Sequence, residues 1–124
     1  MSNKKDSISV ELNKAVQEAD KHNSWFSNSN ILNALSSWKN QLNKNVLDAW
    51  INQYNFVNQN SKVAIIMAGN FPMAGFHDLI SVIISGNNAI IKPSSDDKIL
   101  IEFFVSYLHK EFPETDKLVK TVYD

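Results

Sequence analysis

The 124-residue chain contains no cysteine and no arginine. Without cysteine, these residues can form neither a disulfide nor a thiolate nucleophile. All 12 basic residues are lysines, which lack the planar guanidinium group that reads guanine or phosphate through two parallel hydrogen bonds. The formal net charge of -1 provides no field that would steer the chain onto nucleic acid or an anionic membrane. We therefore expect no nucleic-acid partner.

Long apolar runs are missing as well. The N-terminus, MSNKKDSISV, lacks the apolar core of a signal peptide. The longest apolar runs, such as residues 63–68, are far too short to span a membrane. The sequence therefore predicts a cytoplasmic protein with no membrane partner. It also predicts no metal site, because the neighbouring side chains of His77 and Asp78 would point in different directions from a helix.

The first 60 residues have the pattern of amphipathic helices. Residues 7–22 carry a stripe of apolar side chains at helical spacing, and a second helix is expected to begin after Asn30 as its N-cap. A third helical pattern runs from Val46 to Tyr54. The three tryptophans could mark a surface that stacks on sugars or bases. Their helical period favours core anchors of a helical layer instead: Trp25, Trp38 and Trp50.

At Ser61 the pattern changes to alternating strands and helices. Residues 62–68 form a continuous apolar run, as expected of a strand buried on both faces. A buried helix, a second buried strand and a further helix follow, the last capped by Ser94 or Ser95 with Asp96 and Asp97 as helix-start charges. These elements are expected at residues 73–85, 89–91 and 99–108, and the next element at residues 118–122.

This order predicts an α/β fold with parallel strands joined by right-handed crossovers. The expected fold class is a partial doubly wound parallel sheet, preceded by an N-terminal helical segment. We divide the chain into amphipathic helices at residues 1–60 and a first βαβα unit at residues 61–124. Two strands alone do not make a stable open sheet, so we expect this unit to be incomplete at its C-terminus and the chain to be a fragment.

Ligands of open α/β sheets bind beyond the carboxyl ends of the strands. Two such ends are Ala68-Gly69-Asn70-Phe71-Pro72 and Lys92-Pro93-Ser94-Ser95. Parallel neighbours would bring both to one edge, beside a helix N-terminus suited to an anionic ligand with phosphate and ribose. Ordinary loop chemistry is the alternative interpretation, and it stays open on these residues alone. The three glycines fit neither a G-x-G-x-x-G nor a Walker A motif.

The two loop sequences carry a resemblance to a known family. Gly69-Asn70-Phe71-Pro72, followed by Ser85-Gly86-Asn87-Asn88-Ala89-Ile90-Ile91-Lys92-Pro93-Ser94-Ser95, resembles the coenzyme domain of the aldehyde dehydrogenase superfamily. The run from Ile65 through Gly75-Phe76-His77-Asp78 to Gly86 is similar to its acyl-CoA reductase branch, which includes the fatty-acid reductases of bacterial luminescence. The match spans residues 62–98. It implies a Rossmann-like coenzyme-binding domain.

The resemblance also implies roles for individual residues. Asn70 matches the asparagine whose amide stabilises the thiohemiacetal oxyanion, a task suited to a neutral donor. Lys92 matches the lysine that contacts the adenosine ribose. Ser95 stands where many NAD-dependent relatives have a glutamate, which favours NADP(H) over NAD(H). The remaining expected cofactor-binding residues are their neighbours in the two loops: Ala68, Gly69, Pro93 and Ser94.

The reaction implied by the resemblance is reduction of an acyl-CoA to an aldehyde by a parent enzyme that supplies the catalytic cysteine. This chain alone would be inactive, and superfamily members usually pair as homodimers. A non-catalytic nucleotide-binding or interaction domain derived from the same fold is the first alternative. A purely structural helical module with an accidental N-F-P turn is the second.

Overall fold

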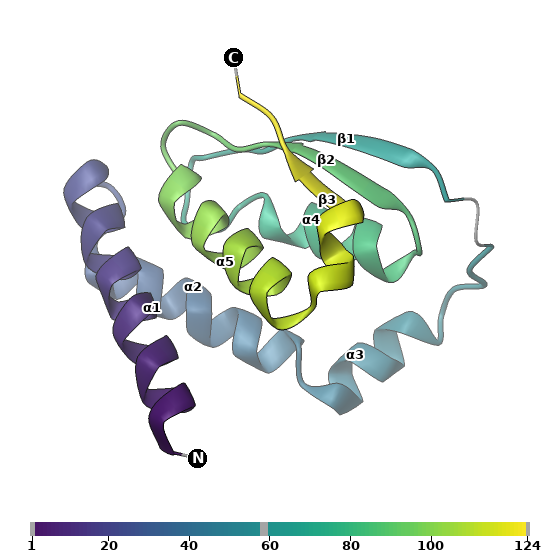
Figure 1. Cartoon of the computed structure of the whole chain (residues 1–124), viewed down its shortest axis with the longest axis horizontal. Coiled ribbons are helices and arrows are strands. Elements are labelled where there is room, and N and C mark those ends of the chain that lie inside the picture. The colour runs from purple at the N-terminus through teal and green to yellow at the C-terminus, as the bar shows by residue number, and fades with distance from the viewer. Residues whose placement is uncertain (1, 58–59, 124) are drawn as a thin grey trace.

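A computed structural model describes residues 2–57 and 60–123 (Figure 1). These residues form a three-stranded parallel sheet and five α-helices, and the first three helices precede the sheet in the chain. This arrangement confirms the predicted α/β class with an N-terminal helical segment. The division at residue 60 stays a prediction.

The N-terminal segment forms helices α1 (Ser2–His22), α2 (Asn28–Gln41) and α3 (Lys44–Ile51). The side chain of Ser27 caps α2 by accepting a hydrogen bond from the Asn30 backbone N–H. The expected N-cap at Asn30 is therefore wrong: the serine three residues earlier accepts from that amide and starts the helix sooner. Trp25 is also no core anchor, because 85% of its surface is exposed.

The sheet consists of β1 (Lys62–Ile66), β2 (Asn88–Lys92) and β3 (Val119–Thr121), paired in chain order. The last residues of β1 and β2, Ile66 and Lys92, lie directly opposite each other. Both strands therefore end at the same edge, as expected for parallel neighbours. The short β3 confirms that a further element follows near residue 118.

Helices α4 (Phe76–Ile84) and α5 (Lys98–Glu111) connect the strands and lie on the same face of the sheet, with a short 3₁₀ turn at Pro113–Lys117 (Figure 1). The rings of Phe76 and Phe104 meet at 5.6 Å between these two helices. On the other face, Ile66 is 83% exposed. The expectation that the first strand is buried on both faces is therefore wrong, because no described element lies over that face.

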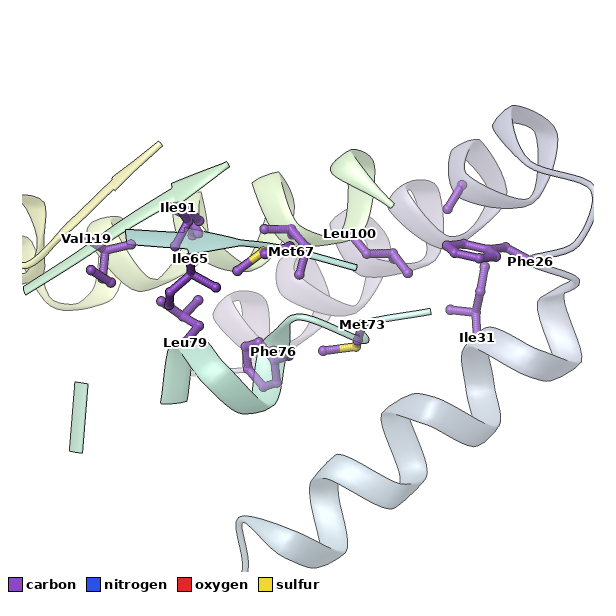
Figure 2. Packing of buried hydrophobic residues seen from close by; sticks show 14 of the residues in the cluster. Phe26, Ile31, Ile65, Met67, Met73, Phe76, Leu79, Ile91, Leu100 and Val119 are labelled. Atoms are coloured by element: carbon purple, nitrogen blue, oxygen red, sulfur yellow. The ribbon is translucent and has the colours of Figure 1, made fainter. Parts of the chain in front are cut away.

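The core lies between the sheet and the helices (Figure 2). Side chains of the strands meet side chains of α4 and α5, and helix α1 packs against the outer side of α5. The central residues of this core are Ile65, Met67, Leu79, Ile91, Leu100, Ile101 and Val119. The core thus lies on one face of the sheet only, and it includes side chains of both β1 and β2 near the edge where these strands end.

Candidate functional site

Two loops meet where β1 and β2 end. The pairing continues one residue beyond β1, since the Met67 N–H donates to the Lys92 carbonyl at 3.0 Å. Beyond this bond, the chain after β1 turns through residues 68–75 into α4, and the chain after β2 turns through residues 93–97 into α5. The prediction that both loops share one edge of the sheet is confirmed.

The two loops are in contact at Gly69. A side-chain Cβ placed on Gly69 would overlap the hydroxyl of Ser94 and would lie 2.6 Å from the Ser94 Cβ. Real Cβ atoms essentially never approach that closely. The glycine is therefore required for close approach of the loops, a standard use of this residue.

Asn70 and Phe71 lie at the exposed tip of the first loop, and Pro72 behind them is buried. The next residue, Met73, has a φ of 60°, and its side chain is only 1% exposed. A left-handed backbone is unfavourable for a residue with a side chain. Burial of Met73 in the core therefore helps to hold this turn in place, with the Asn70 amide at the surface.

A groove of about 340 Å³ opens beside the second loop. Four of the predicted binding residues line it, together with Lys98 at the start of α5: Lys92, Pro93, Ser94 and Ser95. Two lysines, two serine hydroxyls and the positive end of a 14-residue helix border one cavity, which Ile66 and Tyr123 also line. This combination suits a ligand that carries phosphate and hydroxyl groups.

The other predicted residues lie outside this groove. Gly69 is in contact with Ser94, and Ala68 is exposed. Asn70 lies in the first loop, at the same edge of the sheet. The site therefore has two parts, a groove formed by the second loop and an amide displayed by the first.

Two polar residues hold this edge together, and no pattern in the sequence indicated either of them. His22, at the end of α1, donates from Nε2 to the Ser95 carbonyl at 2.8 Å, 73 residues away. Asp97 is 3% exposed, and its carboxylate accepts the Met73 backbone N–H at 2.6 Å. Neither role has a local signal, because both partners are distant in the chain.

Asp97 is held in an unusual electrostatic environment. Burial raises the pKa of its carboxyl from 3.8 to about 7, although the hydrogen bond from Met73 acts in the opposite direction. Desolvation penalises the charged form of any acid, whereas a donor to the carboxylate favours it. Near neutral pH, Asp97 therefore exchanges between a charged and a neutral form.

A second, mainly apolar cavity of about 460 Å³ lies between α3 and α4 and is lined by aromatic side chains, including Trp50, Tyr54, Phe56 and His77. The His77 ring also lies 6.3 Å from the ring of Trp38. The exposed ring of His77 thus lies beside the aromatic side chains of α2 and α3. Among the described residues, no three acidic, histidine or cysteine side chains could hold a metal ion, and no helix could cross a membrane.

A family model described as acyl-CoA reductase (LuxC) matches residues 4–122, nearly the whole chain. The chain belongs to this family. The match to the acyl-CoA reductase family includes the N-terminal helices, for which the sequence offered only a plausible helical pattern. Searches of curated proteins and of solved structures gave no significant match.

The contact between Gly69 and Ser94 predicts that Gly69→Ala destabilises this acyl-CoA reductase family chain by about 1–3 kcal/mol, the usual cost of overpacking. Ser94→Gly in the same chain should recover part of that loss, because it removes the atoms that the new methyl group meets. Urea unfolding of both single variants and the double variant measures the coupling. Additive losses would contradict the close contact.

Burial of Asp97 predicts a pH dependence of stability. Between about pH 4 and pH 7 the folded chain holds a proton that the unfolded chain has released, so the free energy of unfolding should fall as the pH rises through this window. Asp97→Asn should remove this contribution, and the exposed Asp96→Asn should retain it. Urea unfolding at several pH values tests this. An unchanged slope in Asp97→Asn would show that Asp97 is not the group responsible.

Proposed function

We propose that this chain supplies part of the NADP(H) site and one oxyanion donor of an acyl-CoA reductase, which converts an acyl thioester to an aldehyde. The family assignment supports the reaction class. The observation that carries the proposal is the groove lined by Lys92, Ser95 and Lys98, beside the loop that displays Asn70. The substrates of this proposal are an acyl-CoA and, in reverse, an aldehyde.

The groove fits the adenosine end of the cofactor, which when bound supplies the hydride. Lys92 would donate to the ribose hydroxyls. Ser95 brings a hydroxyl and no negative charge to the place where a 2′-phosphate would lie, so the phosphate meets no repulsion there. Lys98 provides a second positive charge in the same groove, and the N-terminus of α5 adds its partial positive charge. These features favour NADP(H) over NAD(H).

Asn70 would stabilise the negative charge that develops on the acyl carbonyl oxygen when a thiolate attacks it. A neutral amide suits this task because it donates a hydrogen bond without holding a counter-charge in the ground state. Since the chain has no cysteine, the attacking thiolate comes from another part of the enzyme. In this proposal, these residues bind the cofactor and stabilise the oxyanion, and another part of the enzyme supplies the nucleophile. A homodimer and a cytoplasmic location remain part of the proposal.

The lack of a thiol favours one alternative, a non-catalytic nucleotide-binding domain of the same fold. It shares the groove with the first proposal but assigns no task to Asn70. The two proposals therefore differ in whether substitution of Asn70 affects turnover.

Asn70→Ala should lower the rate of acyl-CoA-dependent NADPH oxidation by the complete enzyme about a hundredfold, the usual effect of losing one oxyanion donor. Asn33→Ala, an exposed substitution on α2, is the matched control and should leave the rate unchanged. Equal rates for both variants would contradict the role of Asn70. Absence of turnover in the unsubstituted enzyme, with any acyl-CoA or aldehyde and either cofactor, would favour the binding domain.

Ser95→Glu should weaken NADPH binding at least about tenfold, which corresponds to about 1.4 kcal/mol, because a carboxylate would repel the 2′-phosphate. NADH binding should be retained or improved, since a glutamate can accept from the 2′-hydroxyl. Titration of both cofactors by fluorescence gives the two dissociation constants. The control Ser36→Glu adds the same charge on α2. Equal weakening for NADPH and NADH would contradict the assignment of the phosphate to Ser95.

A further inference from the structure

Asp97 does not perform the task that its place in the chain suggests. It occupies the N-cap of α5, where an aspartate usually accepts a hydrogen bond from its own helix, yet its side chain makes no such bond. Its Oδ2 instead accepts the backbone N–H of Met73, 24 residues earlier, at 2.6 Å. A buried carboxylate therefore joins the loop after β2 to the loop after β1.

The bond reaches the first loop at its most constrained point. Met73 is one of two described non-glycine residues with a positive φ, which is 60°, and its side chain is buried in the core. Backbone in this region persists only when its surroundings hold it. The Asp97 carboxylate and the buried Met73 side chain together provide that restraint.

The same loop is restrained at its other end by the contact of Gly69 with Ser94. Both restraints come from the short segment 94–97, which also forms part of the wall of the groove. Asn70 lies between the two restrained ends, three residues before Met73. These two contacts therefore restrain the backbone on both sides of Asn70 relative to the groove.

We propose that Asp97 is a positioning residue that holds Asn70 in register with the groove through the backbone of Met73. This inference rests on the proposed role of Asn70 as an oxyanion donor. A carboxyl group suits the task, because it accepts this bond in both protonation states, and the bond is shorter and stronger when the group is charged. Its other oxygen, Oδ1, is buried without a hydrogen-bond partner among the described residues, a costly arrangement that helix capping does not explain.

Loss of Asp97 should affect turnover more than cofactor binding. The groove keeps Lys92, Ser95 and Lys98 when Asp97 is replaced, so the KM for NADPH should change little. A displaced Asn70 would stabilise the oxyanion less well, which lowers kcat by about ten- to a hundredfold, the effect expected of a displacement of about 1 Å. A purely structural defect would instead reduce the fraction of active enzyme, and the loss of rate would not depend on whether Asn70 is present.

The test is a double-mutant cycle in the complete enzyme with Asp97→Ala, Asn70→Ala and the double variant. If Asp97 acts through Asn70, the double variant should be no slower than Asn70→Ala alone. Asp97→Asn, which keeps an oxygen acceptor for the Met73 N–H, should recover much of the rate, and the exposed neighbour Asp96→Asn should behave as the unsubstituted enzyme. Losses that multiply in the double variant would overturn the positioning role while leaving that of Asn70 intact.

A second measurement does not depend on turnover, so it tests the contact between Asp97 and Met73 even if Asn70 has no catalytic role. Hydrogen exchange of the Met73 amide, followed by NMR above pH 7 where Asp97 is charged, should be slow in the unsubstituted chain and in Asp96→Asn. It should be at least about tenfold faster in Asp97→Asn, because the neutral acceptor is weaker. An unchanged exchange rate in Asp97→Asn, together with no recovery of kcat, would overturn the inference. If Asn70→Ala has no effect on kcat, the proposed function fails, and the positioning role fails with it.

Discussion

The parallel pairing of β1 with β2 is the constraint on which the rest of the structure depends. Its register places Ile66 opposite Lys92, and one more bond joins Met67 to Lys92. A shift by one residue would turn every side chain of a strand to the other face. Such a shift would expose Ile65 and would also separate Gly69 from Ser94. The core and the candidate site therefore depend on the same pairing.

The helical layer supports this edge of the sheet through α5. Helix α1 packs along α5, whose first residue borders the groove, and His22 at the end of α1 binds the Ser95 carbonyl. The N-terminal helices are thus connected to the cofactor loop by packing and by one hydrogen bond. The family match over both the helices and the sheet is consistent with this dependence.

The sequence predicted the parallel sheet and the shared edge correctly because those features follow from local patterns. The apolar run at 62–68 indicated a strand, but it could not reveal which face another element covers, so the exposure of Ile66 was missed. The start of α2 was misplaced because Ser27 and Asn30 are both good N-cap residues. Local sequence patterns thus determined which elements form, and tertiary contacts determined their boundaries and burial.

The candidate site was predictable to a similar extent. Lys92, Ser94 and Ser95 were found from the order of strands and from the resemblance, and they do line one groove. Asp97 was interpreted as a helix-start charge, since acidic residues commonly occur there. Its partner is 24 residues away, and that of His22 is 73 residues away. Only the assembled fold could pair them.

The groove formed by the second loop, at the carboxyl edge of the sheet, is the proposed binding site of the cofactor. Titration of the ¹⁵N-labelled chain with NADPH, followed through its backbone amides, tests this most directly. We expect saturable shifts for Lys92, Ser94, Ser95 and Lys98, with little change around the aromatic cavity between α3 and α4. Shifts confined to that cavity, or no saturable shift at any amide, would contradict it.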